Sequence, residues 1–293
     1  MNLSKEEAVQ FVTEILGISV PSNLEEDRVT FLNMLIKATH SSVPWQNITL
    51  LGEAEADRHK PTLKEIKEAM MCGFGGLCYS IGVFMTYLLQ ALGYEAYFST
   101  GSVRNHPDNH IIAIVENLTS PGSKHLVDAW CGWPTFEAIP LDFDVESTIY
   151  SHSFLEFKFI RKGDTYLRLH RGDLYTQALL PGDSSVPAEW RKVYEFDLTP
   201  RELSHFDQSM SDIYTLPSSA VSPFLLSFCA IIFNNLKLVV IKDTTLIIEK
   251  DNHEMEFTKF SSREEMISTM KTYFPQITVE DITKALNTLH LLE

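Results

Sequence analysis

The stretch Gly73-Phe-Gly-Gly-Leu-Cys78 stands immediately before an apolar run, residues 79–92, which predicts a helix that ends near Gly93. This order puts Cys78 in the first turn of the helix. The N-terminal end of a helix carries partial positive charge and unpaired N–H groups, which stabilise a thiolate over a thiol. Gly75 and Gly76 allow backbone angles closed to other residues, so a substrate can approach the chain closely. One interpretation of Cys78 is a nucleophile, and the other is a small core residue.

Two candidate partners for the thiol follow along the chain. His110 opens a β-like run, residues 110–115, and Asp128 lies in a second run, residues 126–130. Pro121-Gly122 between them is a strong turn signal, so we expect adjacent antiparallel strands. A histidine accepts the proton of a thiol, and a buried carboxylate orients the imidazole and stabilises its charged form. The alternative for the histidine is a structural or solvated side chain, whereas a carboxylate in an apolar run is costly unless paired.

The composition indicates a soluble intracellular enzyme, and the length suggests about two domains. The 293 residues are 44% hydrophobic and carry a formal net charge of -15, which argues against nucleic acid as a partner. The longest apolar stretch, residues 224–233, is about half a membrane span, and the polar N-terminus does not resemble a signal peptide. We therefore expect a cytoplasmic monomer with no membrane partner. The four cysteines have no disulfide-like or metal-ligand spacing, so no metal is expected.

The pattern of apolar residues divides the chain into three parts, which predict an α+β fold. Residues 1–95 read as helical, residues 96–205 as short alternating strands of an antiparallel barrel or meander, and residues 206–293 as a mixture. Gly163-Asp164 predicts a hairpin turn between two of the strands. Helix starts are predicted at four sites that match a capping box or a similar cap: Ser4, Ser22, Ser262 and Thr278.

The sequence resembles the arylamine N-acetyltransferases. Phe74-Gly-Gly-Leu-Cys78 is similar to the Arg-Gly-Gly-x-Cys motif of that family, His110 precedes an aliphatic strand as in the family, and Leu126-Val-Asp-Ala129 is similar to Val-Asp-x-Gly. Val43-Pro-Trp-Gln-Asn47 is similar to Val-Pro-Phe-Glu-Asn, and Val193-Tyr-Glu-Phe-Asp-Leu-Thr-Pro200 to Tyr-x-Phe-x-Leu-x-Pro. The resemblance extends from about residue 5 to residue 290 in the same order, most like animal members of the family.

This resemblance implies a fold and a place for the site. The fold would be an N-terminal helical bundle, an antiparallel β-barrel and a C-terminal α/β lid, over residues 1–95, 96–205 and 206–293. Cys78 from the first part would meet His110 and Asp128 from the second in the cleft between domains, as a papain-like catalytic triad.

The resemblance also implies an activity, the transfer of acetyl from acetyl-CoA to arylamines or hydrazines by a ping-pong route through a Cys78 thioester, in xenobiotic metabolism. A chain with a net charge of -15 repels an anionic co-substrate such as acetyl-CoA. A CoA site therefore needs local positive potential. Two alternatives stay open. One is a related acyltransferase or amide synthase with another acyl donor or acceptor, and the other is a non-catalytic homologue that binds aromatic ligands.

Further site residues are implied only by position in the resemblance. Trp45, Val103 and Cys131 match positions that border the acceptor pocket, and Ser218 and Ser219 match a region near CoA. The alternatives are plain core for Trp45, an ordinary strand residue for Val103, and a surface turn for the two serines.

Two departures from the family pattern put acceptor and donor preference in question. Phe74 replaces the usual Arg, and Cys131 in Ala129-Trp-Cys-Gly132 replaces a position that is often Phe.

Overall fold

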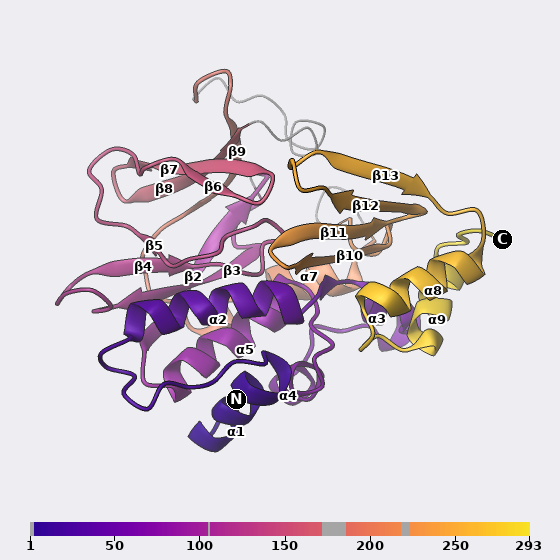
Figure 1. Cartoon of the computed structure of the whole chain (residues 1–293), viewed down its shortest axis with the longest axis horizontal. Helices are drawn as coiled ribbons and strands as arrows, with labels where there is room; N and C mark the ends of the chain where they lie inside the picture. Colours follow the sequence, from indigo (N-terminus) through magenta and orange to yellow (C-terminus); the bar gives the residue numbers. More distant parts are fainter. Residues whose placement is uncertain (1–2, 105, 172–185, 218–222) are drawn as a thin grey trace.

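The structure is a computed structural model that describes residues 3–104, 106–171, 186–217 and 223–293. Helices gather at the N-terminal part of the chain, a curled sheet follows, and a second sheet with its own helices lies beside them (Figure 1). Within the described residues, no helix is long and apolar enough to span a membrane.

The first 92 residues are mainly helical, as predicted. The helices are α1 (Lys5–Gln10), η1 (Phe11–Ile15), α2 (Arg28–Ser42), α3 (Ile48–Gly52), η2 (Glu55–Asp57), α4 (Leu63–Met71) and α5 (Cys78–Ala91). The predicted cap at Ser4 is confirmed, because its side chain accepts from the backbone N–H of Glu7 and the Glu7 carboxylate accepts in return.

The predicted helix start at Ser22 is wrong, because α2 begins at Arg28. The Arg28 guanidinium donates to the Glu25 carboxylate at 2.9 Å and to the carbonyl of Gly93 at 3.0 Å. This contact with the chain just after α5 is a tertiary one, so the local cap pattern could not reveal it.

Helix α5 is the centre of the main core. Eleven of its fourteen residues are buried, as expected for a helix that is apolar on all sides. It packs against two strands of the curled sheet, β2 (Glu95–Val103) and β3 (His110–Glu116). The predicted stop is confirmed: α5 ends at Ala91 and Gly93 has a φ of +89°.

The middle of the chain forms an eight-stranded sheet in which every strand pair is antiparallel. The remaining strands are β4 (Lys124–Val127), β5 (Ile139–Pro140), β6 (Tyr150–His152), β7 (Leu155–Lys162), β8 (Thr165–Arg171) and β9 (Arg191–Phe196). The order is β5-β4-β3-β2-β9-β8-β7-β6, so the described strands make a curled sheet with two ends where the sequence predicts a barrel or meander. Apolar side chains from β3, β4, β7, β8 and β9 meet inside the curl.

The hairpins that carry the site match the sequence prediction. β3 and β4 pair antiparallel, with Ala113 opposite Val127, and Gly122 in the turn has a φ of +83°. The hairpin at Gly163 is also confirmed, with Lys162 opposite Thr165. The run predicted over residues 126–130 is shorter, because β4 ends at Val127 and the chain leaves the sheet at Asp128.

The last part holds a five-stranded antiparallel sheet in the order β1-β10-β11-β12-β13. The strands of this sheet are β1 (Trp45–Gln46), β10 (Cys229–Asn234), β11 (Lys237–Lys242), β12 (Thr245–Glu249) and β13 (Met255–Lys259). The helices that follow β9 along the chain are η3 (Leu203–Phe206), α7 (Asp207–Thr215), α8 (Arg263–Tyr273) and α9 (Val279–Thr288). The caps at Ser262 and Thr278 are confirmed by side chains that accept from Glu265 and Asp281. β10 begins at Cys229, five residues later than the predicted run.

Helices α8 and α9 cover one face of this sheet and pack with α3 from the N-terminal part. Strand β1, also from the N-terminal part, is an edge strand of the same sheet, with Trp45 opposite Ile231. Segments far apart in the sequence therefore interleave, and the division at residues 95 and 205 stays a prediction.

Candidate active site

Cys78 is the first residue of α5 and is 6% exposed. The preceding loop lies against β1: the N–H of Gly76 donates to the carbonyl of Pro44, and the N–H of Gln46 donates to the carbonyl of Gly76. Gly75 has a φ of +67°, and a Cβ there would lie 1.9 Å from the Pro44 oxygen. Only glycine fits this approach, which holds the thiol at the helix N-terminus.

His110 and Asp128 meet at one end of the β3–β4 hairpin. His110 Nε2 lies 3.0 Å from Asp128 Oδ1, and the side chains are 3% and 0% exposed. Burial alone would lower the pKa of His110, but the Asp128 charge and hydrogen bond, together with Cys78, outweigh burial and raise this pKa to about 10. Burial also disfavours the Asp128 carboxylate, yet His110, Arg168 and Tyr194 lower its pKa below the usual value. The imidazole is thus held in its protonated form.

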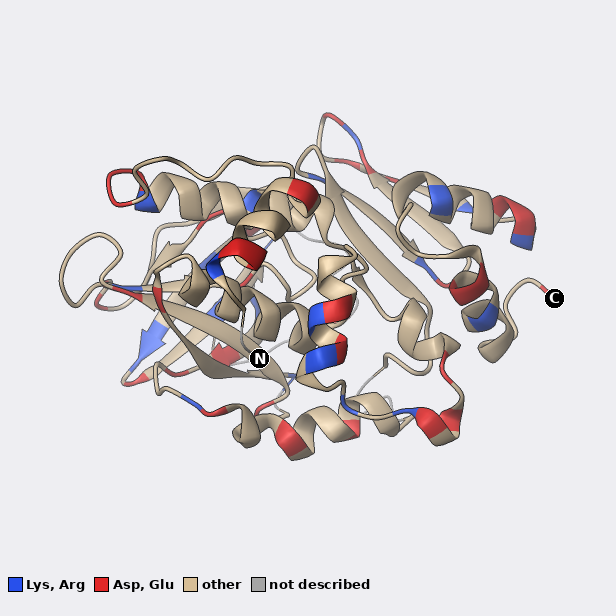
Figure 2. Cartoon of the chain, turned by 90° about the horizontal axis from the view of Figure 1, so that it is seen from below, with Lys and Arg blue, Asp and Glu red and all other residues tan. Residues whose placement is uncertain are grey.

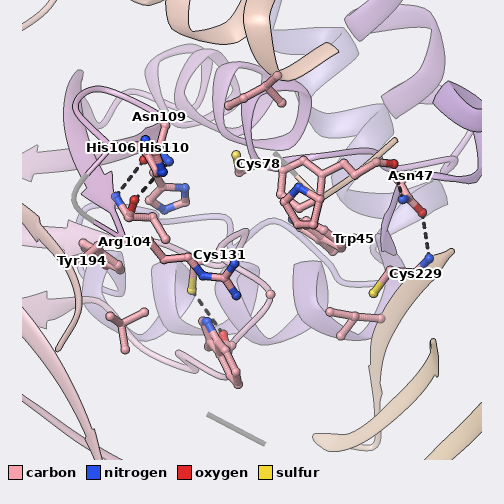
Figure 3. A pocket seen from close by; sticks show the side chains of 18 of the residues that line it. Trp45, Asn47, Cys78, Arg104, His106, Asn109, His110, Cys131, Tyr194 and Cys229 are labelled. Atoms are coloured by element: carbon pink, nitrogen blue, oxygen red, sulfur yellow. Dashed lines mark hydrogen bonds between the residues drawn. The ribbon is translucent and has the colours of Figure 1, made fainter. Parts of the chain in front are cut away.

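The structure brings together all three residues of the expected triad. The Cys78 side chain interacts with His110, and both line one cavity (Figure 3). Because Nε2 of His110 is bonded to Asp128, Nδ1 is the nitrogen left to serve the thiol. The catalytic roles of the three residues stay predictions.

Two side chains that contact Asp128 were not identified as site residues from the sequence. Tyr194 on β9 donates its hydroxyl to Asp128 Oδ2 at 2.7 Å, and the guanidinium of Arg168 on β8 lies 3.9 Å from the same oxygen. Tyr194 is the first residue of the segment that resembles Tyr-x-Phe-x-Leu-x-Pro, so a signal was present, but nothing in that segment indicates a bond to Asp128. Arg168 did have a signal in the sequence, because an arginine inside the apolar run Tyr166-Leu-Arg-Leu169 implies a buried partner.

A cavity of about 300 Å³ opens in front of Cys78 and His110. Trp45, Val103 and Cys131 all line it, so the structure places the three expected pocket residues around one space. Ser218 and Ser219 lie outside the described residues. The rest of the lining is Asn47, Arg104, His106, Asn109, Gly132, Trp133, Val193, Tyr194, Ile213, Pro223, Phe224, Ser227, Cys229, Ile231 and Lys242.

The cavity wall is mostly apolar and aromatic. Trp45 and Phe224 make an edge-to-face pair with ring centroids 5.2 Å apart, and Trp133 packs edge-on to His170 at 5.2 Å. Asn47 joins the wall to the second sheet, because it accepts from the N–H of Cys229 at 2.8 Å (Figure 3). A flat aromatic ligand suits such walls.

The charged lining of the cavity contrasts with the acidic chain. Figure 2 shows acidic positions spread over helices and loops of the molecule. The described part of the cavity lining, however, includes Arg104, His106 and Lys242 and no Asp or Glu. Arg104 has a φ of +53°, and its side chain reaches into the cavity (Figure 3). The cations Arg104 and Lys242 of the described lining are thus not offset by an acidic side chain within it.

The four cysteines are free, as the spacing predicted. Cys131 and Cys229 share the cavity with Cys78, but burial raises the pKa of each to about 12. Both therefore remain protonated at neutral pH. Among the residues that the structure describes, no cluster of His, Cys, Asp or Glu could hold a metal ion.

Phe74, which departs from the family pattern, is hydrogen-bonded to a second residue that departs from it, Gln46. Gln46, where the family segment has Glu, donates from Nε2 to the carbonyl of Phe74 at 3.3 Å, and its Oε1 accepts from the N–H of Ile48 and of Thr49. A neutral amide and an aromatic residue therefore stand side by side at the loop that precedes Cys78.

Comparison with known proteins agrees with this architecture. A family model described as N-acetyltransferase matches residues 28–283. Arylamine N-acetyltransferase 2 of Rattus norvegicus is 26% identical over 213 residues, which cover 68% of this chain and 71% of that protein. Arylamine N-acetyltransferase 1 of the same organism is 23% identical over 245 residues, covering 80% and 82%.

Solved structures share the fold at lower sequence identity. Arylamine N-acetyltransferase of Mycobacterium marinum superposes with a TM-score of 0.76 at 16% identity, covering 97% of this chain and 100% of that one. Its structure in complex with CoA gives a TM-score of 0.74 at 16% identity, covering 96% and 99%. The family match over residues 28–283, supported by these relatives, means that the chain belongs to the arylamine N-acetyltransferase family.

Proposed function

We propose that the protein transfers an acetyl group from acetyl-CoA to the nitrogen of an aromatic amine or hydrazine, through a thioester on Cys78. One observation carries the proposal: Cys78 stands at the N-terminus of α5 beside a buried His110–Asp128 pair, and thiol and imidazole face the same cavity. Burying the charges of His110 and Asp128 costs solvation free energy. A role in stabilising a thiolate on Cys78 accounts for that cost.

In the first half-reaction, the Cys78 thiolate attacks the carbonyl carbon of the acetyl thioester. The tetrahedral intermediate carries an oxyanion, to which the backbone N–H of Cys78 is a candidate donor, since the first N–H groups of a helix have no intrahelical acceptor. The bond from carbon to the CoA sulfur then breaks, and CoA leaves with the proton of His110. The acetyl group remains on Cys78.

In the second half-reaction, the amine nitrogen attacks the same carbonyl carbon. Neutral His110 accepts the proton of the amine, the bond to the Cys78 sulfur breaks, and the thiolate is regenerated with the amide as product. Asp128 orients the imidazole and stabilises its cationic form in both half-reactions.

The cavity wall supports the assignment of the two substrates. Trp45, Val103 and Cys131 would border the aromatic ring of the acceptor. Arg104 and Lys242 would attract the phosphates of CoA. This local positive charge would offset the repulsion between the anionic co-substrate and a chain of net charge -15. A related structure from Mycobacterium marinum contains CoA. A CoA contact for Ser218 and Ser219, and a cytoplasmic monomer that acts on xenobiotics, stay predictions.

The test is the intact mass of the protein after brief incubation with acetyl-CoA and no acceptor. We expect one added acetyl group, which an aromatic amine then removes. Cys78→Ala should gain none, and Cys72→Ala, at an exposed cysteine, should gain one like the wild type. No adduct on the wild type would refute acetyl transfer. Adducts from other acyl-CoA donors would then favour a different acyltransferase, and none from any donor would favour a binding protein.

A further inference from the structure

Arg168 is a fully buried cation that the reaction above does not use. Its exposed fraction is 0%, and it points into the curl of the eight-stranded sheet, with the guanidinium carbon 4.6 Å from the ring centre of Phe157. Arginine is rarely buried to this extent without partners, because its charge loses hydration. Its partners therefore indicate its purpose.

Most of these partners belong to the segment that leaves the sheet after Asp128. Nη1 donates to the Thr135 hydroxyl at 2.7 Å and to the Cys131 sulfur at 3.4 Å, and Nη2 donates to the carbonyl of Pro134 at 3.2 Å. Cys131, Gly132 and Trp133 of this segment line the cavity. The rigid donor fork of Arg168 thus fixes the backbone that supports one wall of the pocket.

The same guanidinium lies 3.9 Å from Asp128 Oδ2, the oxygen that also accepts from Tyr194. With a Cys78 thiolate and a protonated His110, Asp128 and Arg168 make two negative and two positive charges. Without Arg168, the buried group would carry one net negative charge, which favours uptake of a proton.

No other nearby group offers a replacement charge among the described residues. Burial lowers the pKa of His40 to about 3 and that of His170 well below its usual value, and it lowers the pKa of His152 as well. Burial raises the pKa of Tyr194 and of Cys131. His170 Nε2 accepts from Arg168 Nε at 2.8 Å, which requires an unprotonated nitrogen. Arg168 is thus the one permanent cation against Asp128, beside the titrating His110.

We propose that Arg168 is a positioning residue, which holds Asp128 ionised for His110 and fixes the Cys131–Thr135 segment as the acceptor wall. It acts through these groups and does not touch the substrate. The second role rests on the proposed function, whereas the first needs only the thiol and its partners.

The test of the first role is the rate of Cys78 alkylation by iodoacetamide as a function of pH, which needs neither acetyl-CoA nor amine. For Arg168→Met, we expect the midpoint of the profile to move up by about one pH unit. Arg168→Lys keeps a cation at this position, so its midpoint should move clearly less than that of Arg168→Met. Thr135→Val is the matched control, since it removes one partner of Arg168 and leaves the charge.

A purely structural Arg168 predicts a different result. In an Asp128→Asn background the carboxylate that Arg168 pairs with is gone, so Arg168→Met should move the midpoint clearly less than it does in the Asp128 protein. A full shift in that background, or no shift in the Asp128 protein, would overturn the charge role. If Arg168→Met does not fold, as judged by circular dichroism, Arg168→Gln is the second neutral variant. An Arg168→Lys midpoint that moves as far as that of the neutral variant would also overturn it.

The second role is tested with steady-state kinetics. Arg168→Lys loses the fork, so we expect the KM for a bulky aromatic amine to rise about fivefold while kcat falls less than twofold. An unchanged KM for all amines would refute the wall role. A wild-type protein with no acetyl transfer would refute the proposed function and leave the alkylation result standing.

Discussion

His110 Nε2 lies 3.0 Å from Asp128 Oδ1, although the two residues come from the start of one strand and from the chain just after another. Both are removed from water, so each stabilises the charge of the other strongly. This hydrogen bond makes His110 and Asp128 an acid–base unit, in which Nε2 of the imidazole keeps its proton toward Asp128. The effects expected of substitutions in this pair follow from it.

Asp128→Asn should abolish most activity while the protein still folds. The amide retains the shape of the carboxylate but neither its charge nor its preference for the imidazole N–H. We expect kcat/KM for acetyl transfer to fall by roughly 10³- to 10⁴-fold, as in other triads. Stopped-flow acetylation with circular dichroism as a folding control measures this. A loss below tenfold would contradict the role of the carboxylate.

The stability of the pair should depend on pH in the alkaline range. The folded pKa of His110, about 10, lies above its ordinary value of 6.5, so its contribution is complete below about pH 6.5 and is lost as the pH rises through about 10. Asp128 has a lowered pKa, so its contribution is lost in acid instead. The free energy of unfolding, from urea titration, should differ between wild type and Asp128→Asn by an amount that shrinks from pH 6.5 to 10. A difference independent of pH would contradict this.

The four thiols should react in two classes. Cys131 and Cys229, whose pKa values burial raises to about 12, should resist iodoacetamide near pH 8, whereas Cys72, which is exposed, and Cys78, the cavity thiol beside His110, should react. Prior incubation with acetyl-CoA should protect Cys78 and leave Cys72 labelled. Peptide mass spectrometry locates the label. Fast labelling of Cys131 would contradict its raised pKa.

Gly75→Ala should be much more harmful than a glycine replacement in an open turn. The new Cβ would lie 1.9 Å from the Pro44 oxygen, so the loop before Cys78 must move. We expect a loss of roughly 2–4 kcal/mol in unfolding free energy. Gly122→Ala is the matched control, with a φ of +83° but nothing within 4 Å of the added Cβ, and should cost about 1 kcal/mol. Equal losses would mean that the contact with Pro44 does not matter.

Arg104→Gln should weaken the use of acetyl-CoA. The guanidinium reaches into a cavity whose described lining carries no acid, so its loss removes attraction for the phosphates. We expect the KM for acetyl-CoA to rise roughly fivefold, with little change in kcat. Added salt should raise the wild-type KM in the same direction. Lys64→Gln, at a side chain 84% exposed on α4, is the control and should leave this KM unchanged.

Local features of the sequence determined the elements that carry the site. The double glycine and the apolar run predicted a helix that starts at Cys78, and the Pro121-Gly122 turn predicted the β3–β4 hairpin. These signals are readable because they act over a few residues: glycine permits a positive φ, and apolar periodicity matches one secondary structure. The family motifs added the expected triad, and the family itself is confirmed.

Tertiary structure decided what lies around that triad. Arg168 reaches Asp128 from β8, Tyr194 reaches it from β9, and Lys242 enters the cavity from β11, each from a strand far along the sequence. Arg28, the first residue of α2, likewise donates to the carbonyl of Gly93, which is far along the sequence. Such contacts depend on how the sheets curl and interleave, and strand patterning reports which residues face inward but not which of them meet. The nucleophile could therefore be found from its neighbours in sequence, whereas the charges that tune it required the fold.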